Sequence, residues 1–202
     1  MMKFEIFDIR NFTEEEYIFT CDNMSESRKC RLERYKNSED KLRMAVAESR
    51  LKKLIAELSG EKTENVFVDN LPSGKPFAKV FGKNLNVSIS HSGNFVAVAV
   101  SENDIGIDIE TRDNISKALI DRALFDDEKA YVGEFSHKLS REQRIKFLRV
   151  WTAKEAYLKL TGEGLSVLHK VNTLPFIENS AHGYEIFCKA EEDYVCTVIG
   201  KK

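Results

Sequence analysis

The spacing of apolar residues predicts a long helix and two short strands in the first third of the chain. Over residues 39–59 apolar side chains recur three and four positions apart, which is the period of a helix with one core-facing side. The pattern ends at Gly60, a residue typical of helix ends. Residues 4–9 and 65–69 are short apolar runs of the strand type, so we expect the helix to pack on strands.

A rigid loop and a β-hairpin are predicted next. Residues 71–76 contain two prolines and a glycine, which restrict the backbone, and they include Lys75. Residues 85–91 and 95–101 alternate or are rich in valine, and the intervening residues 92–94 are Ser, Gly and Asn, which favour a tight turn.

The second half of the chain predicts another set of strands and helices. Three isoleucines in residues 105–110 alternate with a glycine and two carboxylates, so this strand should bury isoleucine and present carboxylate. Helices are predicted over residues 116–131 and 141–160, and a closing pair of strands over residues 183–199. The predicted fold is α+β, with two packed lobes: residues 1–102 and 103–202.

Composition places the chain among ordinary globular proteins, since 42% of its 202 residues are hydrophobic and 32% are charged. A net charge of −2 provides no positive field for nucleic acid or an anionic membrane. No apolar run approaches the ~20 residues that cross a bilayer and no signal peptide is visible, so we expect a cytoplasmic protein. The four cysteines lack CxxC spacing, and we expect reduced, buried thiols.

Asp108 and Glu110 form the first candidate site. Side chains two apart in a strand leave the same face about 6.6 Å apart. At ~4 Å and an effective dielectric constant of roughly 20, two carboxylates repel by about 4 kcal/mol, which a hard divalent cation such as magnesium converts into attraction. The alternative is the solvated face of an edge strand, which this triplet alone favours.

The helix over residues 145–160 adds another carboxylate. Glu155 and Lys159 lie one turn apart beside an apolar stripe, and Glu155 could be a third metal ligand. The alternative is an ordinary ion pair between them, worth about 0.2–0.5 kcal/mol. The apolar stripe consists of Phe147, Val150, Trp151 and Leu158.

Three further polar residues are candidates for ligand contact. Lys154 falls within the apolar stripe, where an unpaired ammonium is costly, so it either reaches solvent along the helix surface or pairs with a phosphate. Ser90 and His91 end a strand just before the hairpin turn, a position from which they could meet a ligand. A lone histidine at such a rim is more often structural.

Three ordered motifs resemble the signature of the surfactin-synthetase-type 4′-phosphopantetheinyl transferases. They are Ser-Ile-Ser-His-Ser at residues 88–92, Gly-Ile-Asp-Ile-Glu at 106–110 and Trp-Thr-Ala-Lys-Glu-Ala-Tyr-Leu-Lys at 151–159. The likeness extends from about residue 34 to residue 165. It implies a monomer of two similar α/β lobes related by pseudo-twofold symmetry, with the active site in the cleft between them.

The activity that the resemblance implies is transfer of 4′-phosphopantetheine from coenzyme A to a serine of an apo acyl or peptidyl carrier protein, with release of 3′,5′-ADP. The catalytic residues would be Asp108, Glu155 and Lys159. Magnesium would be held by Asp108, Glu110 and Glu155. Coenzyme A would contact Lys75, Ser90, His91, Lys154, Lys159 and Arg43, and the neighbouring Arg34 and Lys36 match the family loosely.

Several points stay open at the level of sequence. The base that takes the serine proton is either Glu155 or a metal-bound water. The role of Glu128, the carrier protein and the tolerance for acylated coenzyme A are not readable. The alternative functions are a non-catalytic regulatory module that binds coenzyme A and another magnesium-dependent phosphoryl enzyme. The latter is disfavoured because the chain has no GxxxxGK[ST] or GxGxxG motif.

Overall fold

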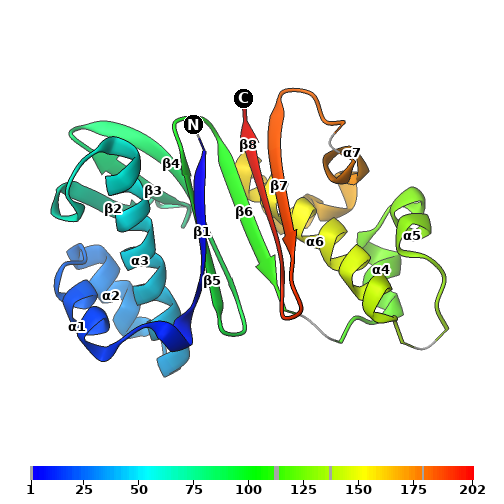
Figure 1. Ribbon diagram of the computed structural model, residues 1–202, viewed down its shortest axis with the longest axis horizontal. Helices are drawn as coiled ribbons and strands as arrows, with labels where there is room; N and C mark the ends of the chain where they lie inside the picture. The colour runs from blue at the N-terminus through cyan, green and yellow to red at the C-terminus, as the bar shows by residue number, and fades with distance from the viewer. Residues whose placement is uncertain (1, 112–113, 137, 179) are drawn as a thin grey trace. The chain divides into compact units, whose positions relative to one another are not determined.

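A computed structural model describes residues 2–111, 114–136, 138–178 and 180–202. The chain divides into two compact units, Met1–Ile105 and Gly106–Lys202. Both units are mixed α+β structures that contain antiparallel strands, which confirms the predicted fold class (Figure 1). The division into lobes 1–102 and 103–202, their pseudo-twofold relation and a cleft between them stay predictions.

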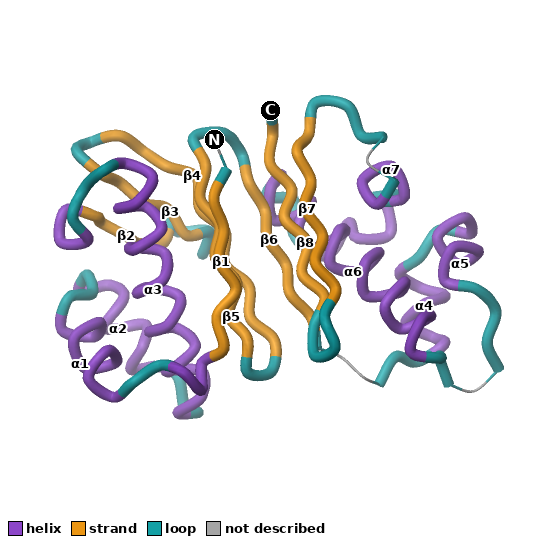
Figure 2. The backbone as a smooth tube through the Cα atoms, in the orientation of Figure 1, coloured by secondary structure: helices purple, strands orange, loops and turns teal. Residues whose placement is uncertain are grey.

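The first unit is a five-stranded antiparallel sheet with helices on one face (Figures 1 and 2). The strand order is β1 (Lys3–Asp8), β5 (Phe95–Ser101), β4 (Lys83–Ser92), β3 (Pro76–Val80) and β2 (Val66–Asn70). The helices are α1 (Glu14–Asp22), α2 (Glu26–Arg34) and α3 (Ser38–Ser59), with short 3-10 turns at Ile9–Asn11 and Thr63–Asn65.

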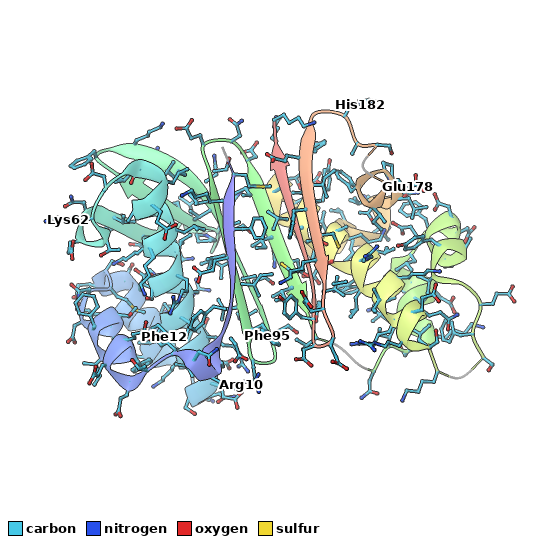
Figure 3. The ribbon with its side chains drawn as sticks, viewed as in Figure 1. Arg10, Phe12, Lys62, Phe95, Glu178 and His182 are labelled. Carbon is cyan, nitrogen blue, oxygen red and sulfur yellow. The ribbon has the colours of Figure 1, made fainter. Side chains whose placement is uncertain are left out.

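Helix α3 covers the sheet because its apolar face matches the sheet's inner face. Leu51 and Ile55 are fully buried in one core with Val98 of β5, and side chains fill the layer between this helix and the strands (Figure 3). Gly60 ends the helix in the left-handed conformation with φ of 74°. The predicted helix over residues 39–59 is therefore confirmed.

The second unit consists of a three-stranded sheet, with strand order β6, β8, β7, and several helices. The strands are β6 (Ile105–Glu110), β7 (Tyr184–Ala190) and β8 (Val195–Lys201). The helices are α4 (Lys117–Ala123), α5 (Asp126–Val132), α6 (Arg141–Thr161) and α7 (Leu174–Ile177), with a 3-10 segment at Leu165–Lys170. The long helix α6 packs on β8, and all four members of its predicted apolar stripe are buried.

Two predictions about this chain are wrong in detail. Residues 116–131 form two helices rather than one, because Leu124 and Phe125 are extended and the Glu128 carboxylate accepts the Phe125 N–H at 2.9 Å, which starts a new helix. Two of the four cysteines, Cys30 and Cys188, are exposed rather than buried. Among the described residues, no helix is long and apolar enough to cross a membrane.

Candidate functional site

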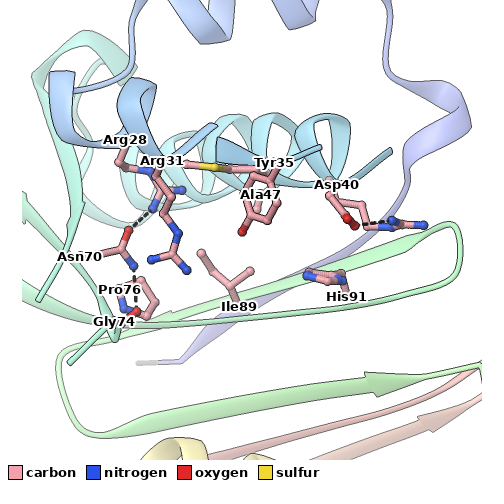
Figure 4. Close-up of a pocket in the computed structure, with 12 residues that line it drawn as sticks. Arg28, Arg31, Tyr35, Asp40, Ala47, Asn70, Gly74, Pro76, Ile89 and His91 are labelled. Carbon is pink, nitrogen blue, oxygen red and sulfur yellow. Dashed lines mark hydrogen bonds and ion pairs between the residues drawn. The ribbon is translucent and has the colours of Figure 1, made fainter. Parts of the chain in front are cut away.

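The first unit contains a pocket of about 370 Å³ between its helices and the sheet (Figure 4). Its walls come from α2, the first half of α3, the loop between β2 and β3, and the end of β4. Apolar and aromatic side chains form much of the lining, and charged groups surround them. The lining residues are Arg28, Arg31, Tyr35, Asp40, Arg43, Met44, Ala47, Asn70, Gly74, Pro76, Ile89 and His91.

Among the residues that the structure describes, one arginine that lines the pocket has no carboxylate partner. Arg31 is exposed and, within the described part of the chain, forms no ion pair. Arg43 differs, because its guanidinium lies 2.8 Å from both Asp40 and Glu39 and also donates to the Gly93 carbonyl at 2.9 Å. An anionic ligand would therefore meet Arg31 without displacing a carboxylate, whereas it would compete with two carboxylates for Arg43.

The predicted coenzyme A contacts of this unit lie in different places. His91 lines the pocket, and Lys75 is half-buried between two lining residues, Gly74 and Pro76. Strand alternation places Ser90 on the opposite face of β4 from Ile89 and His91, and it is buried there. The structure thus separates Ser90 from the pocket, although sequence adjacency suggested that Ser90 and His91 share one rim.

Five polar or aromatic pocket residues were missed by the sequence analysis: Arg28, Arg31, Tyr35, Asp40 and Asn70. Arg28 and Arg31 lie three positions apart, so a helix over residues 26–34 would have placed them on one side, and Tyr35 follows as its C-cap. The loosely matched Arg34 lines a neighbouring depression together with Arg31, and Lys36 is exposed. The spacing of these residues was readable from the sequence, but the helix that places them on one side was not predicted.

In the second unit, Gly106 determines how closely strand β6 lies against helix α6. A Cβ atom at Gly106 would lie 1.8 Å from the Ala156 carbonyl oxygen, so only glycine allows this approach. Asp108 and Glu110 share the Gly106 side of the strand and therefore point toward α6. The alternative to a metal site, in which both carboxylates form the solvated face of an edge strand, does not hold for Asp108, because Asp108 is buried.

The close approach of β6 and α6 brings Asp108 to Lys159. Lys159 Nζ donates to Asp108 Oδ1 at 2.7 Å, with the lysine side chain 31% exposed and the aspartate side chain 3% exposed. Glu155 lies one helical turn before Lys159 on α6 and is half-buried. Among the described residues, no three histidine, cysteine or acidic side chains gather in an arrangement able to hold a metal ion.

Lys154 has a buried carboxylate as its partner. Its side chain has no exposed surface, its ammonium lies 2.7 Å from Glu128 Oε2, and it also donates to the Val171 carbonyl. Glu128 Oε1 in turn accepts the backbone N–H of Thr173 at 2.8 Å and its hydroxyl at 2.9 Å. The partner of Lys154 in this structure is thus a buried carboxylate, at a position where the sequence analysis expected either solvent or a phosphate.

Burial and pairing act on Lys154 in opposite directions. Desolvation lowers the pKa of its ammonium, and the hydrogen bond and charge of Glu128 oppose that shift without cancelling it. Glu128, whose role the sequence left open, thereby links α5 to α6 and to the residues around Thr173 in this structure.

Sequence models of one family match nearly the whole chain. The model described as the 4′-phosphopantetheinyl transferase superfamily matches residues 104–199, and the one described as 4′-phosphopantetheinyl transferase, N-terminal, matches residues 11–103. The chain belongs to the 4′-phosphopantetheinyl transferase superfamily. The resemblance of its three motifs to this family is thereby confirmed.

Individual 4′-phosphopantetheinyl transferases are similar over most of the chain. The gsp protein of Aneurinibacillus migulanus is 28% identical over 74% of this chain and 60% of its own length. The psf-1 protein of Bacillus pumilus is 31% identical over 66% of this chain and 56% of its own length. The matched region thus spans about 60% of the length of these relatives.

Among solved structures, a holo-(acyl-carrier-protein) synthase from Bacillus anthracis in complex with coenzyme A (3′,5′-ADP) is similar, with 18% sequence identity and a TM-score of 0.42. The similarity covers 49% of this chain and 91% of that one.

Proposed function

We propose that this protein transfers 4′-phosphopantetheine from coenzyme A to a serine of an apo acyl or peptidyl carrier protein and releases 3′,5′-ADP. Membership of the transferase family is the observation that carries this proposal. The local geometry of each unit supports it, because one unit has a pocket for an anionic nucleotide and the other has the charged groups that phosphoryl chemistry requires.

The pocket of the first unit suits the 3′-phosphate and adenine of coenzyme A. An apolar and aromatic lining that includes Tyr35 and Ile89 accepts a planar base, and Arg31 and His91 at its edge suit a phosphate. Lys75 is proposed as a further phosphate contact because its two neighbours line the pocket. Arg43 is proposed mainly to hold the β4–β5 turn through Gly93.

The second unit is proposed to supply the reacting groups. Mg²⁺ typically binds through one or two carboxylates, water and substrate phosphates, so Asp108, Glu110 and Glu155 do not all need to converge before the substrate binds. Asp108 and Glu110 share one strand face, and Glu155 lies one turn from the lysine that Asp108 contacts. Bound there, magnesium would neutralise pyrophosphate charge.

In the proposed step, the carrier serine oxygen forms a bond to the β-phosphorus, and the bond from that phosphorus to the bridging oxygen of 3′,5′-ADP breaks. Lys159 would turn from Asp108 to the pyrophosphate and stabilise the charge that develops on it. Glu155 is the proposed base for the serine proton. We further propose that the protein acts in the cytoplasm as a monomer, without nucleic acid or membrane partners.

The test is intact mass spectrometry of an apo carrier protein that is incubated with the protein, coenzyme A and magnesium. We expect the carrier to gain one phosphopantetheine group, and we expect a chelator to prevent this gain. Carriers from fatty-acid, polyketide and peptide synthesis should be compared in parallel. Binding of coenzyme A without modification of any carrier would favour the regulatory module, and no binding would remove both functions.

A further inference from the structure

A series of polar contacts runs from the interior of the first unit to the rim of its pocket. It begins at Glu48 of α3, whose fully buried carboxylate lies 2.6 Å from Arg28 Nε. Arg28 Nη1 donates to Asn70 Oδ1 at 2.7 Å. Asn70 Nδ2 then donates to the Gly74 carbonyl at 2.9 Å, and Figure 4 shows both of these amide contacts.

The interior end of this series is fixed by charge. A buried carboxylate without a cation is very unfavourable, so Glu48 holds Arg28 in place. Lys52 lies 3.2 Å from Glu48 and donates to the Asn23 carbonyl at 2.8 Å, which restrains the carboxylate further. Arg28, with only 4% of its surface exposed, is therefore restrained by packing and by charge, and it offers Asn70 a buried donor.

The outer end of the series is the loop that carries Lys75. The loop closes on itself, because the Gly74 N–H donates to the Leu71 carbonyl and the Leu71 N–H donates to the Lys75 carbonyl, both at 2.8 Å. These bonds set the shape of the loop but not its distance from α2. The side-chain amide of Asn70 is a direct link between the two, since it joins Arg28 of the helix to Gly74 of the loop.

We propose that Asn70 is a positioning residue for coenzyme A binding, which it supports by holding residues 74–76 at a fixed distance from α2. The inference rests on the proposed function, because it takes coenzyme A as the ligand of this pocket. Asn70 itself lines the pocket, but Arg28 and Gly74 already engage its Oδ1 and Nδ2 atoms, so we expect it to act through the Gly74 backbone. The residues that it places are Lys75 and Pro76. Nothing in the three sequence motifs points to this residue.

Three variants test the proposal. Asn70→Ala removes both contacts, and we expect the Kd and KM for coenzyme A to rise about tenfold, a change equivalent to one lost hydrogen bond. At saturating coenzyme A, kcat should stay within about twofold, since the reacting groups are elsewhere in the sequence. Asn70→Asp keeps an acceptor for Arg28 but has no donor for Gly74, so it should weaken binding as well.

Asn65→Ala is the matched control. Its amide donates to Glu61 at 3.2 Å on the surface of the same unit, and it does not line the pocket. We expect its Kd and KM for coenzyme A to equal those of the wild type. A merely structural role for Asn70 would lower the melting temperature and leave KM unchanged, so thermal unfolding is recorded for all variants.

The outcomes separate this inference from the proposed function. If wild-type protein binds coenzyme A and both Asn70 variants bind within twofold of it, Asn70 is not a positioning residue while the proposed function stands. If only Asn70→Ala binds weakly, the Gly74 contact is not needed and the inference is overturned. If Asn70→Ala does not fold, the coenzyme A affinity of Asn70→Asp tests the inference alone: weaker binding supports it, and binding within twofold of wild type overturns it. If wild-type protein does not bind coenzyme A, the proposed function fails first and the inference fails with it.

Discussion

At the residue scale, Lys154 and Glu128 show how a buried ion pair can hold several elements of one unit together. Breaking such a pair from one side usually costs about 3–5 kcal/mol, because the remaining charge stays buried. We expect Lys154→Met to lower the free energy of unfolding by this amount in a urea titration. The double variant Glu128→Gln/Lys154→Met should recover much of the loss, and a single-variant cost below about 1 kcal/mol would contradict a structural role.

Gly106 gives a second prediction at this scale. A methyl group at this position would overlap the Ala156 carbonyl oxygen, which belongs to the backbone and cannot rotate away. We expect Gly106→Ala to destabilise the protein by at least about 2 kcal/mol, within the range typical of overpacking. The addition of Ala156→Gly should not restore stability, because the clash is with backbone. Restoration by that second change would show that the contact is with a side chain.

At the element scale, the capping box of α1 makes stability depend on pH. Glu16 accepts the Thr13 N–H at 3.0 Å. This hydrogen bond, together with the charges of Arg50 and Lys53, lowers the pKa of Glu16 below its ordinary value of 4.5. Because the folded pKa is lower than the unfolded one, the charged carboxylate stabilises the fold above about pH 4.5, and this contribution is lost as the pH falls through the folded pKa.

Glu16→Gln should therefore reduce the free energy of unfolding at pH 7 by about 0.5–1 kcal/mol, and the difference from wild type should shrink near pH 3. Glu14→Gln is the control, since it removes one exposed charge from the same helix turn at a position outside the capping box. Urea titrations at the two pH values measure the effect. A difference that is the same at both would show that charge is not involved.

Helices and strands whose apolar residues recur at regular spacing were predictable from the sequence, and those without such a pattern were not. Helices α3 and α6 were found because each buries a continuous stripe, and the β4–β5 hairpin because Gly93 marks its turn. Helix α1 was missed because its one buried residue is Thr20, and α2 because it buries Leu32 next to the charged Arg28. The sequence features that mark these two helices are polar N-cap residues, Thr13 for α1 and Ser25 for α2.

Residues of the candidate site were predictable from the sequence only where they belong to a recognisable motif. Asp108 and Lys159 come from two separate motifs, and the structure brings them to 2.7 Å. Arg31 and Asn70 belong to no motif, because their position in the pocket follows from how α2 packs beside the end of β2. The partner of Lys154 was not predictable either, since it lies 26 positions away on another helix.

At the scale of the whole molecule, the proposal assigns different tasks to the two units. Arg31→Ala should raise the KM for coenzyme A about tenfold with kcat almost unchanged, because it removes a charge-assisted contact to the ligand.

Glu155→Gln should lower kcat by about 10²-fold or more with little change in the Kd for coenzyme A. Steady-state kinetics and calorimetry measure both effects.

Lys29→Ala is the control for Arg31, because it removes a cation from the same helix that does not line the pocket. It should leave both constants unchanged. Equal effects of Arg31→Ala and Lys29→Ala on KM would show that general charge, rather than the pocket, attracts the ligand. Near-normal turnover in Glu155→Gln would remove that residue from the proposed chemistry.

The central claim is that cleavage of coenzyme A and modification of a carrier protein are one reaction. Liquid chromatography with mass spectrometry can quantify 3′,5′-ADP and modified carrier in the same sample over time. We expect the two products to appear in equal amounts and only when magnesium and the apo carrier are both present. Release of 3′,5′-ADP without carrier modification would contradict the account and indicate a hydrolase instead.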